Sequence, residues 1–509
     1  MNKSKRVPVI KFESIVKDFP GVRANDGITL EVEKGEIHSL LGENGAGKTT
    51  LMKILYGIYQ PDGGRIYLNG ERVSIDSPKN AIDRGIGMIH QHFKLVPRHT
   101  VAENVVMGNP SASPIDPAKK IADELRRLSE HYGMEFDPQA RVGDLAAGER
   151  QRVEIVKALY RGAEILILDE PTSVLTPQEA ERLFSVLNKM SAEGKTIFFI
   201  THKLEEVMAL SHRVSVLRKG KLVATVEAEE TDRSSLARMM VGREVLFRTE
   251  KEEKPPRGEV LRVEELTVAD ERGLPAVDGV SLRVRGGEIL GIAGVSGNGQ
   301  RELAQALTGM RAVRGGSFAV DGEDLTGLSP REIMERGVAH IPEDRMSTGL
   351  VNELNLKDNS ILRTYREPPY SRGPLLNGDQ VRRHARRLIE EYDIEPSDIH
   401  APAKLLSGGN IQKLVLGREL SLNPRLIVAS HPTHGLDVGA AEQIRNLLLR
   451  QRANGAGVLL ISEDLNELFS ISDRIGVLYE GKIVDTVRAE AADREELGLM
   501  MAGSGRDGR

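Results

Sequence analysis

The stretch Gly42-Glu43-Asn44-Gly45-Ala46-Gly47-Lys48-Thr49 decides how this chain folds. Its two glycines are separated by four residues and followed by Lys and Thr, which is the pattern of a phosphate-binding loop. The preceding run from Glu36 to Leu41 predicts a buried strand, and the apolar spacing from Thr49 onward predicts an amphipathic helix. Strand, loop and helix in that order are the context that the pattern requires.

The residue types of this loop suit a triphosphate. Glycines allow successive backbone N–H groups to curl around an anion, and the N-terminus of the following helix adds a partial positive charge. We expect Lys48 to reach the β- and γ-phosphates and the Thr49 hydroxyl to bind Mg²⁺. The alternative interpretation is a chance glycine-rich turn before a helix, and the complete pattern in its context disfavours it.

Length and composition limit the class of protein. A chain of 509 residues exceeds one hydrophobic core and predicts two or more domains. The net charge of -5 gives no general reason to expect nucleic acid, and the lack of Cys excludes disulfides and thiolate zinc sites. No apolar run approaches the roughly 20 residues that span a bilayer, and we expect no secretory signal at the basic start of the chain. Any membrane role is therefore expected to be peripheral.

The chain contains an internal repeat. Gly35-Glu36-Ile37 recurs as Gly287-Glu288-Ile289, and Pro171-Thr172 recurs as Pro432-Thr433. The offset between the copies grows from 252 to 261 residues, so one insertion separates otherwise matching halves. The repeat predicts a first domain over residues 9–242 and a second domain over residues 259–503. A charged, proline-bearing linker over 243–258 would join them, and a frayed tail over 504–509 would follow.

Each half alternates apolar runs with helical periods, which predicts an α/β fold with a mainly parallel sheet. A helix-rich insert is expected over about 95–150, with a counterpart over about 350–405. The basic run from Arg382 to Arg387 falls in a helical pattern and is interpreted as a solvated face.

Two carboxylates end a predicted strand of the first half, in Ile165-Leu166-Ile167-Leu168-Asp169-Glu170. Asp169 is placed to hold Mg²⁺ through water, and Glu170 is placed to polarise an attacking water as a general base. Two exposed acids at the end of a strand would carry little meaning alone. Beside a phosphate-binding loop they predict hydrolysis of a nucleoside triphosphate.

A second glycine motif, Leu406-Ser407-Gly408-Gly409-Asn410, stands before a predicted helix in the second half and forms another anion site. Together with the phosphate-binding loop and Leu168-Asp169-Glu170-Pro171, it makes both halves resemble the ATP-binding cassette family. The resemblance implies two tandem P-loop, RecA-like α/β domains. Each would have a mainly parallel sheet, an antiparallel β subdomain and a helical subdomain.

In that family two cassettes pack head to tail, and each ATP lies between one phosphate-binding loop and the other cassette's signature serine and glycines. By resemblance, Phe19 would stack on adenine, Gln91 would link the nucleotide to a transmembrane partner, His202 would contact the γ-phosphate and Asp437 would bridge the interface. The implied catalytic residues are Lys48, Glu170 and His202, and the implied Mg²⁺ ligands are Thr49, Gln91 and Asp169. The implied ATP contacts are Phe19, Gly42, Glu43, Asn44, Gly45, Ala46, Gly47, Lys48, Thr49, Thr50, Gln91, Ser407, Gly408 and Gly409.

The two halves differ in an ordered way. In the second half of the chain, six of these residues are replaced. Lys48 and Thr49 become Gln300 and Arg301, and Asp169 and Glu170 become Ser430 and His431. Gln91 becomes Glu343, and His202 becomes Glu463. In the first half Leu145-Ala146-Ala147-Gly148-Glu149 lacks the signature serine and one glycine, and Thr176 replaces the bridging aspartate. With head-to-tail pairing all intact elements fall at one composite site and all lost elements at the other, which favours an intramolecular cassette dimer.

A tandem chain of this kind resembles the ATPase subunit of sugar and nucleoside importers. Ile341-Pro342-Glu343-Asp344-Arg345 and Gly435-Leu436-Asp437-Val438-Gly439 resemble that subgroup, and the segment Gly87–Pro97 with Ser430-His431-Pro432 resembles its nucleoside branch. The implied cofactors are ATP and Mg²⁺. The implied partners are two membrane permease subunits and, indirectly, an extracytoplasmic substrate-binding protein. The chain would then lie peripherally on the cytoplasmic face of the cell (inner) membrane. No nucleic acid is expected as a partner.

The alternative is a soluble tandem cassette that acts on ribosomes or nucleic acid. A translation factor of this kind would resemble a chain with two intact ATP sites and a long charged helical linker. This chain instead has one altered site and a short linker. A DNA-repair cassette would resemble a protein with zinc-binding cysteines, which are absent here.

Overall fold

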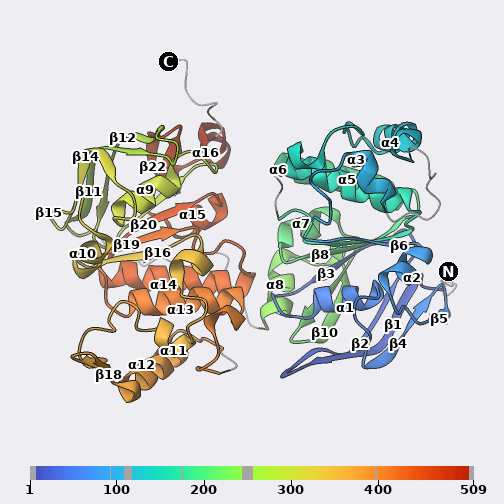
Figure 1. The fold of residues 1–509 in the computed structure, drawn as a ribbon, viewed down its shortest axis with the longest axis horizontal. Coiled ribbons are helices and arrows are strands. Elements are labelled where there is room, and N and C mark those ends of the chain that lie inside the picture. The colour runs from blue at the N-terminus through green and yellow to red at the C-terminus, as the bar shows by residue number, and fades with distance from the viewer. Residues whose placement is uncertain are drawn as a thin grey trace. The chain divides into compact units, whose positions relative to one another are not determined.

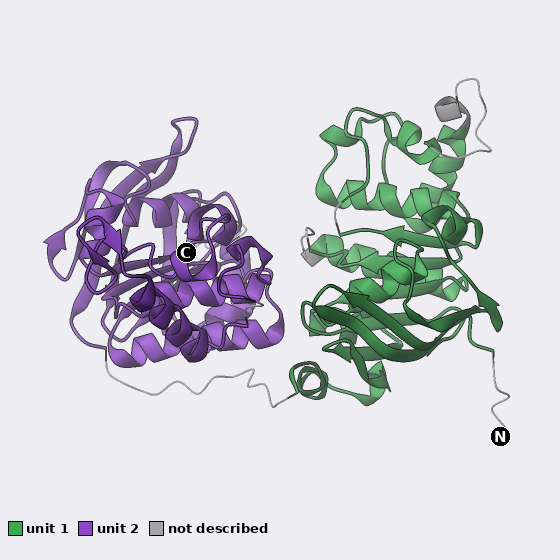
Figure 2. Ribbon diagram, turned by 60° about the horizontal axis from the view of Figure 1, so that its bottom comes forward, with its two compact units in different colours: residues 1–245 green, residues 246–509 purple. Residues whose placement is uncertain are grey.

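The computed structural model describes residues 7–91, 93–107, 117–173, 175, 177–242, 256–395, 398–501 and 503. It divides into two compact units, residues 1–245 and 246–509 (Figure 2). Most of the expected linker, the expected tail, His92 and Thr176 lie outside the described residues, and the expected domain bounds stay a prediction. Among the described residues, no helix has both the length and the apolar composition that crossing a bilayer requires.

A six-stranded sheet forms the centre of the first unit, in the order β10-β9-β3-β8-β7-β6. Its strands are β3 (Ile37–Leu41), β6 (Ile86–Ile89), β7 (Ile165–Asp169), β8 (Thr196–Thr201), β9 (Arg213–Arg218) and β10 (Lys221–Glu227). All neighbours are parallel except β10, which pairs antiparallel with β9. Every residue of β3, β7 and β8 is buried, because helices and a second sheet cover both faces of the parallel strands.

An antiparallel sheet and a group of helices flank this centre on opposite sides (Figure 1). The antiparallel sheet has the order β2-β1-β4-β5 and consists of β1 (Ile10–Phe19), β2 (Val22–Val32), β4 (Gly63–Leu68) and β5 (Glu71–Val73). The helices of the unit are α1 (Lys48–Leu55), α2 (Pro78–Asp83), α3 (Val101–Val106), α4 (Pro117–Tyr132), α5 (Ala147–Tyr160), α6 (Pro177–Ala192), α7 (Leu204–Leu210) and α8 (Arg233–Val241). Helices α3, α4 and α5 supply the expected helix-rich insert.

The second unit repeats the plan, with a six-stranded sheet β16-β19-β20-β13-β21-β22 and an antiparallel sheet β12-β11-β14-β15. Its strands are β11 (Glu259–Ala269), β12 (Pro275–Arg285), β13 (Ile289–Ala293), β14 (Val313–Val320), β15 (Glu323–Asp324), β16 (Val338–Ile341), β19 (Leu426–Ser430), β20 (Gly457–Ser462), β21 (Arg474–Tyr479) and β22 (Lys482–Arg488). Its helices are α9 (Gln300–Leu307), α10 (Pro330–Glu335), α11 (Leu356–Asn359), α12 (Gly378–Glu391), α13 (Gly408–Leu420), α14 (Val438–Asn454), α15 (Leu465–Ile471) and α16 (Arg494–Met501).

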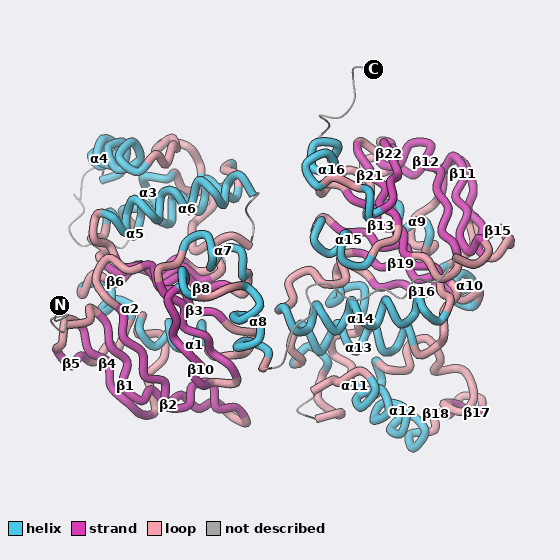
Figure 3. The backbone as a smooth tube through the Cα atoms, turned by 180° about the vertical axis from the view of Figure 1, so that it is seen from behind, coloured by secondary structure: helices cyan, strands magenta, loops and turns pink. Residues whose placement is uncertain are grey.

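The second insert is less helical than the first. Between α11 and α12 it forms a short hairpin of β17 (Ser371–Arg372) and β18 (Leu375–Leu376). The four arginines of the basic run on α12 are exposed, so the expected solvated face is confirmed, while His384 within it is buried. Figure 3 shows α11 and α12 grouped below α13 and α14 in this unit.

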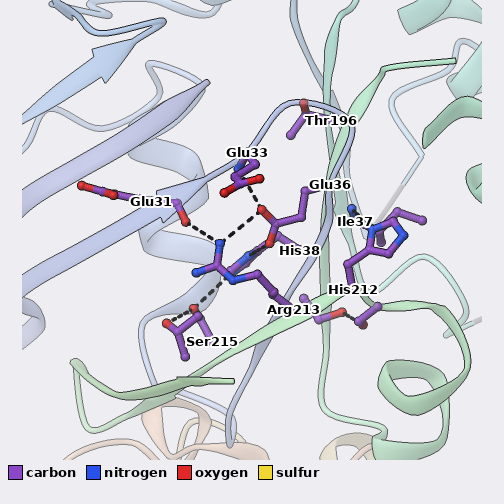
Figure 4. A network of polar contacts seen from close by, with 12 residues as sticks. Glu31, Glu33, Glu36, Ile37, His38, Thr196, His212, Arg213 and Ser215 are labelled. Carbon is purple, nitrogen blue, oxygen red and sulfur yellow. Dashed lines mark hydrogen bonds and ion pairs between the residues drawn. The ribbon is translucent and has the colours of Figure 1, made fainter. Parts of the chain in front are cut away.

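A buried polar network holds the strand that leads into the phosphate-binding loop (Figure 4). His38, fully buried in β3, contacts the Glu36 carboxylate through Nδ1 at 2.7 Å and Ser215 Oγ of β9 through Nε2 at 2.8 Å. The Glu36 carboxylate also accepts hydrogen bonds from the Glu33 backbone N–H at 2.8 Å and from Arg213 of β9 at 3.4 Å. The network therefore ties the start of β3 to its neighbour.

The ionised form of Glu36 is the one that this network stabilises. Burial alone would raise the pKa of Glu36, but the hydrogen bond and charge of His38, the Glu33 amide and the charge of Arg213 hold that pKa below its ordinary value. A carboxylate with a depressed pKa in the folded state contributes stability that is complete above its unfolded pKa and is lost as the pH falls through its folded pKa.

We expect Glu36→Gln to lower the free energy of unfolding by about 1–3 kcal/mol at neutral pH, because a buried charged hydrogen-bond partner is lost. The difference from the wild type should shrink below about pH 4.5, because the unfolded chain then takes up a proton, and it should vanish once the pH falls below the lowered pKa of the folded carboxylate. Urea unfolding at several pH values measures it, with Glu33→Gln, whose side chain is exposed, as the control. A difference that stayed constant down to pH 3 would contradict the assigned network.

Candidate active site

The phosphate-binding loop joins β3 to α1 and is fixed by a neighbouring hairpin. Gly47 has a left-handed backbone with φ of +100°, and a Cβ at this position would collide with the Ala24 carbonyl oxygen. The Asn25 side-chain amide donates to the Gly47 carbonyl at 3.1 Å. Only glycine therefore allows this close approach of the β1–β2 hairpin.

Lys48 lies inside the loop that it closes. Its side chain is buried, and its ammonium group donates to the carbonyl oxygens of Gly42 at 2.7 Å and Glu43 at 2.9 Å. Helix α1 begins at Lys48, and its N-cap, Gly47, has no side chain to cap the first turn. The loop thus combines a cation with backbone N–H donors at a helix N-terminus, which together suit a phosphate group.

Asp169, the last residue of β7, meets the loop through Thr49. The Thr49 hydroxyl donates to the Asp169 carboxylate at 3.0 Å. Burial raises the pKa of Asp169, an effect that the Thr49 hydrogen bond and the charges of Lys53 and Lys48 oppose and the charge of Glu170 reinforces. A hydroxyl and a buried carboxylate are hard oxygen donors, and their contact across the loop fits the ligand preference of Mg²⁺.

Glu170 is held from two sides by the other predicted residues. The Gln91 amide nitrogen donates to one carboxylate oxygen at 2.9 Å, and His202 Nδ1 contacts the other oxygen at 2.9 Å. The hydrogen bond with His202 lowers the pKa of Glu170 despite the opposing effect of burial. Glu170 therefore has the ionised form that a general base requires, in a left-handed backbone conformation with φ of +48°.

The first unit thus brings together six predicted residues: Lys48, Thr49, Gln91, Asp169, Glu170 and His202. The contact of Gln91 within this group is the hydrogen bond from its amide nitrogen to the Glu170 carboxylate. Phe19 lies at the end of β1, half-buried, with its ring packed edge-on against Tyr59 at 5.2 Å between centroids. Gly45 and Asn44 form the exposed tip of the loop, and Thr50 follows in the first turn of α1.

The remaining predicted residues belong to the second unit, where they begin two helices. Ser407 caps α13, and its hydroxyl accepts from the Asn410 backbone N–H at 3.3 Å, so Gly408 and Gly409 form the first turn. Asp437 caps α14, and its carboxylate accepts from the Ala440 backbone N–H at 2.9 Å. Both caps are local contacts within this unit.

The matching loop of the second unit has the same backbone conformation as the phosphate-binding loop but lacks its lysine. Gln300 is buried, and its side-chain amide donates to the Val295 carbonyl at 3.0 Å, as Lys48 does to the matching Glu43. Gly299 has φ of +103°, as Gly47 has +100°. Gln300 therefore replaces the lysine as a structural tie but supplies no positive charge.

The carboxylate pair of the first unit also has a counterpart of altered chemistry. Ser430 stands at the position of Asp169, and its hydroxyl is buried without a partner among the described residues. His431 keeps the left-handed backbone of Glu170, with φ of +45°, and burial lowers its pKa although Glu343 and Glu463 oppose that shift. The two units therefore share the backbone geometry at this position but differ in the side chains.

Two residues that support the site belong to none of the sequence motifs. One is Asn25, described above. The other is Glu206, a buried carboxylate that accepts hydrogen bonds from the Thr172 and Thr201 hydroxyls and so joins the segments that carry Glu170 and His202. The internal repeat carried the signal, because Glu467 makes the same two contacts with Thr433 and Ser462.

Comparison with known proteins agrees with this geometry. The family model described as "ABC transporter" matches residues 25–173 and again residues 277–434. The chain is 49% identical to the glucose import ATP-binding protein TsgD13 of Haloferax volcanii, with 98% of this chain and 96% of that protein covered. It is 48% identical to the guanosine import ATP-binding protein NupO of Bacillus subtilis (97% and 98% covered) and 46% identical to the nucleoside import ATP-binding protein NupA of Lactococcus lactis (97% and 98% covered).

The two matched loops allow a paired test of nucleotide binding. Lys48→Ala removes charge-assisted hydrogen bonds that contribute roughly 1.5–3 kcal/mol each, so we expect ATP affinity to fall about 10- to 100-fold. Gln300→Ala removes only a neutral tie at the matching position and should change the affinity little. Equilibrium binding of a fluorescent ATP analogue measures both, and equal losses in the two variants would contradict the assignment of the first loop.

Proposed function

The chain belongs to the ABC transporter family, and from that premise we propose that it hydrolyses ATP to drive uptake of a nucleoside or simple sugar through a membrane permease. The observation that carries the proposal is the contact of Glu170 with both Gln91 and His202, beside the loop of Lys48 and Thr49. A positioned, ionised carboxylate next to a phosphate-binding loop is the arrangement that triphosphate hydrolysis needs.

At this site each residue has a distinct role. Lys48 and the loop amides hold the β- and γ-phosphates, and the half-exposed Phe19 ring offers a stacking face to the adenine. Glu170 accepts the proton of the attacking water, and His202 both orients Glu170 and contacts the γ-phosphate. Thr49, Asp169 and Gln91 would hold Mg²⁺, which when bound neutralises phosphate charge as the bond to the γ-phosphate breaks.

We infer that Ser407, Gly408 and Gly409 complete this site from the second unit. The sorting of intact and lost elements supports the inference, because cross-pairing collects all consensus elements at one ATP. The Ser407 cap leaves the first turn of α13 as a further anion-binding helix N-terminus. Asp437, at the start of α14, would then lie at the interface between the cassettes.

The second composite site is expected to be inactive in hydrolysis. Charge-assisted hydrogen bonds contribute roughly 1.5–3 kcal/mol each, so loss of Lys, the metal-binding Asp and the signature serine weakens triphosphate binding about a thousandfold or more. Loss of the general base lowers the rate by a further ~10²–10⁴. The depressed pKa of His431 leaves it a weak base, with Ser430 in place of the metal ligand.

The proposed partners are two permease subunits, which would place the chain at the cytoplasmic face of the cell membrane, with an extracytoplasmic binding protein acting indirectly. A cavity of about 100 Å³ is lined by His90, which precedes Gln91, and by Lys94, Glu154 and Arg161 among others; its volume suits a single polar side chain of a permease helix. Gln91 would carry movement at this cavity to Glu170. Similar relatives named for guanosine and nucleoside import favour a nucleoside as cargo, and the relative named for glucose import keeps simple sugars in the proposal.

The composite site is tested by a pair of matched variants. We expect Ser407→Arg to abolish ATPase activity, because its side chain would fill the space for the γ-phosphate. Ala146→Arg, at the matching position of the altered first-half signature, should leave most of the activity. Steady-state phosphate release measures both, and full activity in Ser407→Arg would exclude assembly across the two cassettes.

The role of Glu170 is tested separately. Glu170→Gln should retain ATP binding and lose hydrolysis by about 10²–10⁴-fold, because the general base is removed while the phosphate ligands remain. Binding and single-turnover assays distinguish the two steps. The matched change His431→Gln should leave the rate unaltered, and a loss as large as that of Glu170→Gln would contradict the one-site mechanism.

Transport itself is tested by affinity purification from membranes, followed by uptake assays. The proposal predicts membrane permeases in the purified complex and ATP-dependent uptake of nucleosides or simple sugars. Recovery with ribosomes or nucleic acid, and no permease, would instead support the soluble class.

A further inference from the structure

A cavity of about 450 Å³, lined by both apolar and charged side chains, lies among the helices of the first unit, away from the site described above. Helices α4, α5 and α6 are neighbours around it (Figures 1 and 3). Its lining includes Gly133 after α4, Gln151 and Arg152 of α5, and Arg182 of α6. The volume falls within the range of about 300–1,000 Å³ that is typical of small-molecule sites.

Three buried side-chain atoms of this cavity, on Gln151 and Arg152, have no hydrogen-bond partner among the described residues. Gln151 is only 2% exposed, and neither polar atom of its side chain has a hydrogen-bond partner in the described structure. The buried Nε of Arg152 is also without a partner. Within the described residues, no carboxylate lies within ion-pair distance of Arg152 or Arg182. Buried polar groups without partners are unfavourable unless a ligand or water satisfies them.

Two acidic residues also line the cavity, but neither neutralises the arginines. The Glu179 carboxylate packs against Gly148, where it would collide with any Cβ, so it is directed to the start of α5. Glu135 is exposed. Neither forms an ion pair with Arg152 or Arg182, so the two guanidinium groups stay available to an anion.

The second unit shows what fills the equivalent place. There Asp393 follows Tyr392 as Gly133 follows Tyr132, and Lys413 and Gln443 stand at the positions of Arg152 and Arg182. The Lys413 ammonium lies 3.3 Å from the Asp393 carboxylate and donates to the Asp393 carbonyl at 2.6 Å. The Gln443 amide donates to the same carboxylate oxygen at 2.9 Å. A carboxylate thus joins the two helices in the second unit.

We propose that the cavity of the first unit binds a small oxyanion, a carboxylate or a phosphate, in place of this missing aspartate. Gly133 lacks the side chain that Asp393 supplies, while two guanidinium groups replace the lysine and glutamine. Arginine binds carboxylate and phosphate through paired N–H donors, and the Gln151 amide adds a neutral donor from the cavity wall. The ligand would join α5 and α6 as Asp393 joins their counterparts.

The chain can accept the missing carboxylate, which provides the test. Gly133 has φ of +67° and Asp393 has φ of +50°, and a Cβ added at Gly133 meets nothing within 4 Å. Aspartate and asparagine tolerate this left-handed backbone better than other non-glycine residues. Gly133→Asp should therefore fill the site from within, and Gly133→Asn should test the backbone change without the charge.

The experiment is calorimetric titration of the full-length chain with succinate and, separately, with inorganic phosphate, at an ionic strength fixed with chloride. We expect the wild type and Gly133→Asn to bind an anion that Gly133→Asp does not bind, and Arg152→Leu to weaken that binding about tenfold or more. Gly133→Asp should also raise the thermal midpoint in chloride alone. Phosphate bound at the loop of Lys48 is the same in every variant, so it cancels in the comparison.

The two anions distinguish the sources of the ligand: binding of succinate identifies a carboxylate site, and binding of phosphate alone identifies a phosphate site. Either result supports the proposal if Gly133→Asp removes it. Equal titrations of wild type, Gly133→Asp and Arg152→Leu with both anions would overturn it. The reverse variant Asp393→Gly gives a second, independent test, because it should lower the thermal midpoint and make it rise again with added succinate.

Discussion

The parallel order of the central sheet is the constraint on which the candidate active site depends. Parallel strands deliver the residues that follow them to the same edge of the sheet. Lys48 follows β3, Gln91 follows β6, Asp169 ends β7 with Glu170 next to it, and His202 follows β8. Residues up to 120 positions apart in the chain, Thr49 and Asp169, are thereby placed within hydrogen-bond distance of each other. The Glu36–His38–Arg213 network secures β3 against β9, on the side of β3 opposite β8.

Duplication of this frame allowed the two halves to specialise without loss of the fold. The second unit keeps the left-handed glycine before α9, the left-handed residue after β19 and a buried glutamate that joins two loops. It has changed the side chains that would hold phosphate, metal and water. Gln300 shows how this occurs, because its amide donates to the Val295 carbonyl, which matches one of the two carbonyls that Lys48 contacts, and so maintains the loop without its charge. Structural and catalytic demands on one position are separable.

In the helical part of the first unit it is the first unit, rather than the second, that lacks a side chain found in the other unit. There the second unit keeps a compact arrangement in which Asp393 joins α13 and α14, while the first has a glycine, two arginines and a cavity. Loss of one carboxylate in a close-packed region leaves groups that must be satisfied by water or by a ligand. The proposed oxyanion site follows from that physical requirement rather than from the hydrolytic site.

Sequence alone determined the α/β class, the repeat and the residue types of the site. Glycine spacing, buried apolar runs and carboxylates at strand ends are local patterns, and local patterns specify local backbone structure. The sequence also separated intact from altered motifs, since charge and metal affinity belong to side chains. Only the tertiary structure decided that Gln91 and His202 hold Glu170, that Asn25 and Glu206 support the loops, and that the second insert contains a hairpin. These features depend on contacts between segments distant in the chain, and no local pattern specifies which buried donor meets which acceptor.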